Sequence, residues 1–362
     1  DLNDPGAPFQ HPRKQQLTLQ DIFIYPDLKE IIISDKKQSE KFIDMKELIV
    51  DDLSTSYLMI GNEKVGKTSL LKHLYIEFYT KGYFPLFLSG KDFKKTNEDN
   101  IQKKLEEAIL QQYVGQHVVD QYNQIPIEQK IIFIDDWQKC PLNLTGKRKI
   151  LNYFELSSSR IFLTTSDIQG ARDLLISEQN KNKYRKFEIS EFGHKKRAEL
   201  IEQWLLLGTD ELLQEQEIIQ KKDWTEGQLR SLVSKGHVPS YPFFLLTILQ
   251  TLESSNSHQM KDSTKGHYYD VLIGDALARM ELKNRDIDII KNYISHLAYY
   301  FFQKNDDKVI SNHEFKKFHS TFNTKYELNL NFDIYADKLI RSSLLYREYD
   351  GFKFKYPYVY FY

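Results

Sequence analysis

A phosphate-binding loop is the feature that most constrains this chain, because it has the spacing Gly-x4-Gly-Lys-Thr. The apolar run 57–60 before it has the length of a strand, and residues 67–79 after it have helical length and spacing. Glycines let the backbone fold around phosphates, while loop N–H groups and the helix N-terminus provide positive potential. The residues that we expect to contact a nucleoside triphosphate here are Gly61, Asn62, Glu63, Lys64, Val65, Gly66, Lys67, Thr68 and Ser69. Lys67 would reach the β- and γ-phosphates, and Thr68 would be a ligand of Mg²⁺.

A second motif, Ile131-Ile-Phe-Ile-Asp135-Asp136-Trp137, is an apolar strand that ends in two carboxylates. The carboxyl end of such a strand lies at the sheet edge where the phosphate loop lies. We expect Asp135 to hold Mg²⁺ through water. Asp136 is the candidate to orient or activate the attacking water, or only to polarise the site.

One strand–helix unit, about 83–115, separates the phosphate loop from the acidic strand. That spacing indicates the additional-strand class of P-loop ATPases, in which the next strand supplies a polar sensor of the γ-phosphate. The segment Arg160-Ile-Phe-Leu-Thr164-Thr165-Ser166 fits, with Thr165 or Ser166 as the sensor.

The predicted fold is α/β, with a P-loop parallel sheet that has the additional strand, then a helical domain and a winged-helix domain. We expect an N-terminal linker or entry segment at 1–40, the nucleotide-binding domain at 41–193, the helical domain at 194–284 and the winged helix at 285–362. Within the entry segment, residues 22–25 are a short apolar run, either a strand or an anchor lying over the domain. Ser311 and Glu314 predict a capping box, and Asp350-Gly351 between aromatic runs predicts a hairpin.

Composition and charge indicate which partners and which cellular compartment to expect. The formal charge is −1, so no global field indicates nucleic acid or a membrane. The single Cys140 excludes an intramolecular disulfide framework and fits a reducing compartment, so we expect a cytoplasmic protein. No signal peptide or membrane-spanning run is predicted. The apolar C-terminal segment 356–362 and the start at Asp1 suggest an excised piece of a longer protein.

The combination of motifs resembles the STAND NTPases, which include the NACHT and apoptotic-ATPase-like switch proteins. The resemblance rests on the phosphate loop, the Ile-Asp-Asp-Trp strand end, the Leu-Thr-Thr strand and the segment Tyr241-Pro242-Phe243-Phe244-Leu245. It extends from about residue 20 through the predicted winged helix. The segment 17–28 also looks like the entry segment of bacterial members linked to antiphage defence.

This resemblance implies a switch that is closed around ADP and that oligomerises with ATP to activate a fused effector. Pro242 would lie near the base or ribose. Several relatives carry an arginine where this chain has Ser166, and many carry a phosphate-facing histidine where Tyr356 aligns, so Arg160 or Arg172 are alternative phosphate contacts. Effector and sensor domains outside this chain, a phage-derived trigger and slow ATP hydrolysis are further expectations.

Two other functions stay open from the sequence. A DNA-engaging initiator or loader ATPase also joins a P-loop core to a winged helix, but it requires a basic recognition helix. The candidate helix, about 333–344, contains Asp333, Asp337, Lys338 and Arg341 and is nearly neutral, which argues against nucleic acid as a partner. The third possibility is a module that binds nucleotide without turnover.

Overall fold

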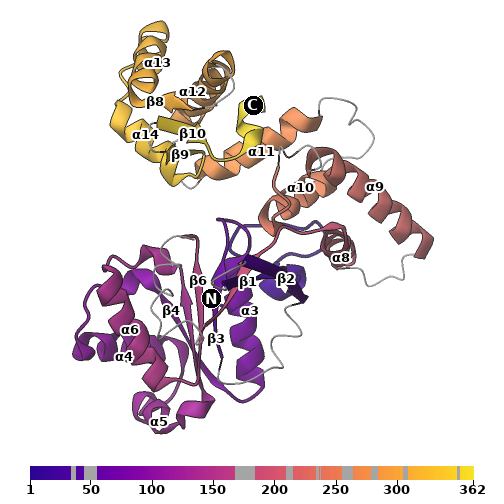
Figure 1. The fold of residues 1–362 in the computed structure, drawn as a ribbon. Helices are drawn as coiled ribbons and strands as arrows, with labels where there is room; N and C mark the ends of the chain where they lie inside the picture. The colour runs from indigo at the N-terminus through magenta and orange to yellow at the C-terminus, as the bar shows by residue number, and fades with distance from the viewer. Residues whose placement is uncertain are drawn as a thin grey trace. The chain divides into compact units, whose positions relative to one another are not determined.

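The computed structural model describes residues 1–33, 38–44, 55–167, 184–208, 215–233, 236, 238–254, 264–278, 284–304, 309–348 and 351–362. The chain forms two compact units (Figure 1). The first comprises residues 1–213 together with Tyr241–Phe243, and the second comprises 214–240 and 244–362. The domain boundaries expected from the sequence stay a prediction.

A seven-stranded, mostly parallel sheet forms the centre of the first unit, in the order β2-β1-β7-β3-β6-β5-β4. The parallel strands are β7 (Tyr184–Ile189), β3 (Ser56–Ile60), β6 (Arg160–Thr165), β5 (Lys130–Asp135) and β4 (Phe84–Ser89). The predicted α/β P-loop fold is confirmed. In particular, β6 lies between the strand that precedes the phosphate loop and the acidic strand, which is the additional-strand arrangement.

Helices cover both faces of this sheet because each connection between parallel strands crosses over it. Figure 1 shows α4 (Glu98–Gln112) and α6 (Leu144–Ser157) on one side and α3 (Lys67–Thr80) on the other. The chain also forms α5 (Val118–Gln124) before β5 and α8 (His194–Leu205) after β7. The helical length and spacing of residues 169–178 also predict a helix in this part of the chain, and those residues lie outside the described ones.

The side chains of the strands alternate between two apolar cores, as the pleat requires. Leu58, Ile132 and Ile134 belong to the core beneath α4 and α6. On the α3 side, Phe162 stacks on Tyr57 and Phe133 with ring centroids 5.0 and 4.9 Å apart. Because these strands are buried on both faces, they appear in the sequence as continuous apolar runs.

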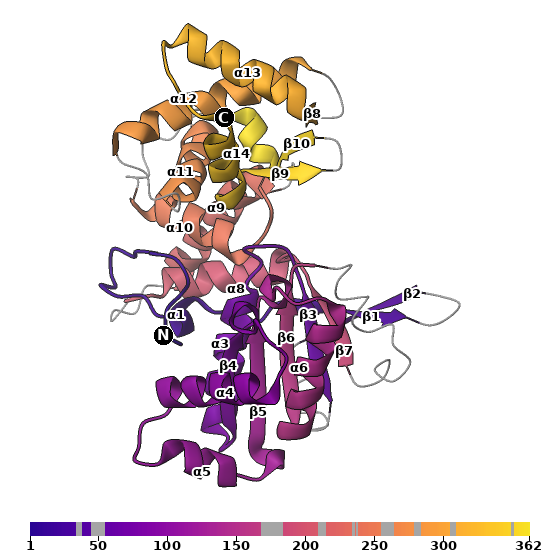
Figure 2. The ribbon, with the colours of Figure 1, turned by 90° about the vertical axis from the view of Figure 1, so that its left-hand side faces the viewer.

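The sheet extends further toward the N-terminus than we expected from the sequence. Strand β1 (Asp27–Ile33) pairs antiparallel with β7 and with β2 (Gln38–Asp44), so it lies within the segment predicted as a linker. Figure 2 shows this pair at the side of the sheet. Residues 27–33 therefore form part of the nucleotide-binding unit.

The segment before β1 anchors to α3, the helix that follows the phosphate loop. After the short helix α1 (Leu19–Ile22), Phe23 stacks on His73 at 3.9 Å, and the Tyr25 hydroxyl donates to Glu77 at 2.7 Å. Of the two interpretations of residues 22–25, the anchor is correct. Burial lowers the pKa of His73, with the charge of Glu77 opposing that effect, so the stack contains a predominantly neutral imidazole near neutral pH.

The described residues of the second unit form α9 (Glu215–Val233), α10 (Pro242–Ser254, from Phe244 onward), α11 (Thr264–Ala278) and α12 (Asn284–Gln303) before its C-terminal part. They are followed by β8 (Ile310–Ser311), α13 (Asn312–Lys325), α14 (Phe332–Arg341), β9 (Leu345–Glu348) and β10 (Gly351–Phe354). Strand β10 pairs with both β8 and β9, which confirms the hairpin, and the Ser311–Glu314 capping box is present. Among the residues described, no helix combines the length and apolarity needed to cross a membrane.

Candidate nucleotide-binding site

The phosphate loop connects the carboxyl end of β3 to the first residue of α3. Gly66 has a φ of 101°, in the left-handed region that glycine adopts without steric cost, and it immediately precedes α3. Lys64 also has a positive φ, of 67°. The Gly61 N–H donates to the Thr165 carbonyl at 3.1 Å, so the start of the loop is tied to the end of β6. These contacts fix the entry and the exit of a backbone turn suited to phosphate.

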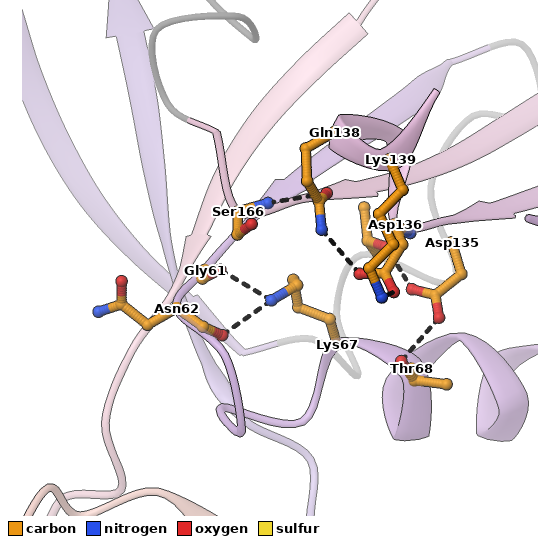
Figure 3. Close-up of polar contacts among 10 residues, drawn as sticks. Gly61, Asn62, Lys67, Thr68, Asp135, Asp136, Gln138, Lys139 and Ser166 are labelled. Carbon is orange, nitrogen blue, oxygen red and sulfur yellow. Dashed lines mark hydrogen bonds and ion pairs between the residues drawn. The ribbon is translucent and has the colours of Figure 1, made fainter. Parts of the chain in front are cut away.

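Lys67 occupies the position that the loop motif predicts for the phosphate-binding cation. Its side chain is buried, with 7% exposure, and its amino group donates to the carbonyls of Gly61 and Asn62 at 2.8 Å each (Figure 3). Both acceptors belong to the loop itself, so the positive charge lies within the turn. A buried ammonium held among loop carbonyls fits the anionic phosphates of a nucleotide.

Thr68 and Asp135 lie next to each other, although 67 positions separate them in the sequence. The Thr68 hydroxyl donates to Asp135 Oδ2 at 2.7 Å, and the Thr164 hydroxyl donates to Asp135 Oδ1 at 2.6 Å. The site thus brings together a hydroxyl and a carboxylate, which are the hard oxygen ligands that Mg²⁺ prefers. Thr68 and Asp135 would hold the ion, and the ion would neutralise phosphate charge. Thr164 fixes the orientation of the carboxylate.

Asp136 follows in the left-handed conformation, with a φ of 53°. Its carboxylate accepts from Gln138 Nε2 at 2.8 Å and from Lys139 Nζ at 2.6 Å, and its N–H donates to the Thr164 hydroxyl at 3.1 Å. Burial by itself raises the pKa of Asp136, but the hydrogen bonds from Lys139 and Gln138 and the charges of Lys139 and Lys67 outweigh burial. The pKa is therefore below its ordinary value, which suits a group that orients water more than one that removes a proton.

Gln138 links the acidic strand end to the sensor strand. While its amide nitrogen donates to Asp136, its amide oxygen accepts from the Ser166 N–H at 3.2 Å. Thr165 is buried, and its hydroxyl accepts from the Asp167 N–H at 3.1 Å. Ser166 therefore connects to Asp136 through one side chain, as Figure 3 shows. The choice between Thr165 and Ser166 as the sensor stays a prediction.

The segment Tyr241-Pro242-Phe243 lies against the phosphate loop. The Asn62 amide donates to the Tyr241 hydroxyl at 2.8 Å, and the Lys64 ammonium lies 4.2 Å from the centre of the Phe243 ring. Pro242 lies beside Gly66, because a Cβ built on that glycine would be 3.8 Å from Pro242 Cγ. Pro242 therefore lies next to the phosphate loop, and its place beside the base or ribose stays a prediction.

Arg160, one of the alternative phosphate contacts, is not brought into the site. Arg160 is the first residue of β6, at the opposite end of that strand from Thr165, and its buried guanidinium packs over the rings of Tyr57 and Phe78. The hypothesis that Arg160 reads the γ-phosphate is therefore wrong. Arg172 lies outside the described residues. Tyr356 belongs to the second unit, where its ring packs on Phe244 at 5.0 Å, and its role as a phosphate contact stays a prediction.

Sequence reasoning missed several residues that build this site. Thr164 was treated only as part of the strand, although it contacts both aspartates, and Gln138 and Lys139 were not considered. Gln138 and Lys139 lie in the turn directly after the acidic strand, and that position could have indicated that they contact Asp136. Tyr241 and Phe243 were noted only as part of a motif.

Gly90, at the end of β4, allows the acidic turn to approach closely. A Cβ at this position would lie 2.6 Å from the Asp136 carbonyl oxygen and 2.8 Å from Trp137 Cα, both of which are backbone atoms. We expect Gly90→Ala to lower the free energy of unfolding by about 1–3 kcal/mol, because overpacked backbone must shift. Thermal unfolding measures this effect. Gly227→Ala is the control, since its Cβ would meet nothing within 4 Å, and equal melting temperatures for the two variants would contradict close packing at Gly90.

Residues 308–362 match a family model described as Novel STAND NTPase 4. This match falls in the C-terminal part of a chain whose first unit contains the phosphate loop and acidic strand described above. The chain has the fold and the phosphate loop of a P-loop NTPase. No curated protein matches the sequence of this chain.

Several solved structures match the chain at low sequence identity. The Walker-type ATPase PABY2304 of Pyrococcus abyssi is 12% identical, with 88% of this chain and 92% of that chain covered and a TM-score of 0.41. The Aeropyrum pernix ORC1 protein in complex with DNA is 10% identical, with coverages of 83% and 84% and a TM-score of 0.42. Thermotoga maritima RuvB is 13% identical, with coverages of 83% and 84% and a TM-score of 0.38.

Proposed function

We propose that this chain is the nucleotide-dependent switch core of a STAND NTPase, closed with ADP and assembling with ATP. In this proposal ATP hydrolysis is slow and resets the switch. The observation that supports this proposal most is that Tyr241 and Phe243 contact the phosphate loop, at Asn62 and Lys64, while the chain continues directly into the second unit.

Helix α10 begins in one unit and continues in the other. Its first two residues, Pro242 and Phe243, belong to the unit that contains the phosphate loop, and the residues from Phe244 onward belong to the second unit. A helix transmits displacement along its axis because its backbone hydrogen bonds resist stretching. A nucleotide that shifts the loop would therefore move the start of α10.

A switch requires the two nucleotides to bind its two states with different affinity. Asn62 and Lys64 contact the 241–243 segment, Gly66 lies near Pro242, and all three lie in the loop that would surround the β- and γ-phosphates. Contacts that depend on the third phosphate would supply the required free-energy difference. Tyr356 and a winged helix formed by residues 285–362 are proposed to close over ADP. The element order α12-β8-α13-α14-β9-β10 supports this part.

The arrangement around Asp136 supports slow turnover. Both carboxylate oxygens accept hydrogen bonds, one from Gln138 and one from Lys139. These hydrogen bonds lower the pKa of Asp136, so its carboxylate is a weaker base toward the attacking water, and each oxygen keeps a second acceptor site with which to orient it. We therefore propose that Asp136, Asp135 and Lys67 serve hydrolysis, with Thr68 and Asp135 at Mg²⁺.

The wider role is proposed from the resemblance. A fused or neighbouring effector would be activated by assembly, and a phage-derived trigger would engage a sensor in cytoplasmic antiviral defence. The winged helix is not proposed to bind DNA, because Arg341 on α14 pairs with Asp337 at 2.8 Å and leaves that helix nearly neutral.

The test has two parts: identification of the nucleotide bound to the purified protein, and removal of the Tyr241 hydroxyl group. Denaturing the purified protein should release ADP, while an empty site would contradict a closed resting switch. Tyr241→Phe removes the acceptor of the Asn62 amide, so we expect the ratio of ADP to ATP affinity to change by about 1 kcal/mol, roughly fivefold. Titration calorimetry with each nucleotide measures the ratio.

Tyr153→Phe is the matched control. It deletes a tyrosine hydroxyl that donates to Gln102 at 2.7 Å in the same unit, away from the phosphate loop. Its nucleotide affinities should equal those of the wild type. An unchanged ratio of ADP affinity to ATP affinity in Tyr241→Phe would mean that the 241–243 segment does not distinguish the two nucleotides.

A further inference from the structure

A cavity of about 520 Å³ opens beside the nucleotide site, on the turn that follows β4. Its walls come from residues 91–95 and from the first two turns of α4, through Asn100 and Lys104. None of its lining residues belongs to the phosphate loop or to the acidic strand. The cavity is therefore separate from the predicted nucleotide site.

The lining of this cavity is strongly basic. Lys91, Lys94, Lys95 and Lys104 line it against a single carboxylate, Asp92, which leaves four positive charges minus one negative charge, or +3. Lys91, Lys94 and Lys95 are exposed, and across the described ranges none of them forms an ion pair. Of the four lysines, Lys104 has a carboxylate partner, Glu107, at 2.5 Å.

Unneutralised like charges around a concave surface repel each other and concentrate positive potential in the cavity. An anion that enters would relieve this repulsion. The chain as a whole has a formal charge of −1, so the basic cavity is a local feature and not a reflection of overall composition. The acidic residues of the first turn of α4, Glu98 and Asp99, are not among the lining residues.

The residue types indicate what kind of anion fits. Lysine ammonium groups are point charges on flexible stems that accommodate tetrahedral phosphates, whereas planar carboxylates gain most from arginine, and no arginine lines the cavity. Phe93 is the aromatic residue of the lining, and its side chain is 2% exposed, so it offers no face on which a base could stack.

We propose that this cavity binds a chain of closely spaced phosphate groups, independently of base sequence. A nucleic-acid backbone and inorganic polyphosphate share this chemistry. Lys91, Lys94 and Lys95, which pair with no carboxylate of the described residues, provide contacts to successive phosphates, and the cavity is large enough for more than one phosphate. The site is distinct from the nucleotide switch and does not depend on it.

The turn that carries the lysines packs against the core of the first unit, and this packing gives the site a defined shape. The Cys140 thiol donates to the Phe93 carbonyl at 3.6 Å, and the Phe93 ring packs edge-on against Phe154 at 5.4 Å. Gly90 fixes the start of the turn against Asp136 and Trp137. The lysine side chains therefore extend from a fixed base, and substituting them removes charge without disturbing the core.

The experiment measures the anisotropy of a fluorescein-labelled single-stranded DNA of mixed sequence, titrated with the purified full chain at several salt concentrations. Lys91→Ala/Lys94→Ala/Lys95→Ala should weaken binding by roughly tenfold or more and reduce the slope of log K against log salt by about 2, since three phosphate contacts are lost. Asp92→Asn should tighten binding several-fold, roughly as expected for removing one repulsive charge. A gain of affinity cannot arise from misfolding.

The control Lys316→Ala/Lys317→Ala/Lys325→Ala removes the same charge from α13 and should bind like the wild type. Unlabelled RNA and polyphosphate should displace the DNA, and the stronger competitor identifies the source of the phosphates. Displacement by polyglutamate at equal charge would overturn the preference for phosphate. Equal losses in both triple variants, or no measurable binding of any phosphate chain by the wild type, would overturn the site.

Discussion

Replacing Lys67 with alanine is expected to leave the purified protein without bound nucleotide. The Lys67 ammonium is buried and lies among the loop carbonyls, where it is the cation that the β- and γ-phosphates would meet. Losing a buried, hydrogen-bonded charge partner costs about 3 kcal/mol, roughly a hundredfold in Kd. Identification of the nucleotide released on denaturation, together with titration calorimetry, measures this loss.

The same variant tests whether nucleotide controls assembly. In the full-length protein with its trigger, Lys67→Ala should remain unassembled in light scattering. Lys81→Ala removes an exposed lysine at the end of the same helix, where it pairs with Glu77, and should behave like the wild type. If Lys67→Ala has lost its nucleotide and still assembles at the wild-type level when triggered, the switch model is ruled out.

Replacing Asp136 with alanine should separate hydrolysis from binding. We expect phosphate release to fall by about 10² to 10⁴-fold, because a positioned carboxylate contributes that much to attack by water. Nucleotide content should remain near the wild-type value, since Lys67, Thr68 and Asp135 are unchanged. Steady-state phosphate release by the triggered full-length protein measures the first effect, and analysis of retained nucleotide measures the second.

Asp120→Ala is the matched control, because Asp120 is an exposed carboxylate on α5. It should release phosphate at the wild-type rate. If wild type and Asp136→Ala both release nothing under triggering conditions, the chain binds nucleotide without turnover. A variant Asp136→Ala as active as the wild type would assign the water-orienting role to another group.

Local motifs made the centre of the site predictable. The phosphate loop depends on eight consecutive residues, and the acidic strand is an apolar run that ends in Asp135 and Asp136. Parallel strands place their carboxyl ends at one edge, so proximity of the two motifs followed from fold class alone. The 2.7 Å contact between Thr68 and Asp135 agrees with that expectation.

Contacts between distant segments were harder to predict. The Asn62–Tyr241 hydrogen bond joins residues 179 positions apart, and no local pattern indicates it. The turn after β5 bends back because Asp136 adopts a left-handed conformation, which brings Gln138 and Lys139 to its carboxylate. Strand β1 was missed because Lys29 and Glu30 interrupt its apolar pattern.

The error about Arg160 was avoidable. A strand rises about 3.3 Å per residue, so the first residue of the six-residue strand β6 lies roughly 17 Å from its last. The site lies at the last residue, since the Thr165 carbonyl accepts from Gly61. Strand direction alone therefore excludes the arginine, and its burial among aromatic rings indicates a structural role.

The strand order also determines when the site can form during synthesis. Strand β3, which leads into the phosphate loop, pairs with β6 and β7, whose residues follow it by about a hundred positions or more. The ribosome therefore releases the loop long before the strands that support it. Non-local pairing of this kind slows folding and leaves apolar edges exposed in the meantime. The nascent chain is consequently open to chaperones until Ile189 has emerged, and the site that would bind nucleotide is among the last parts to form.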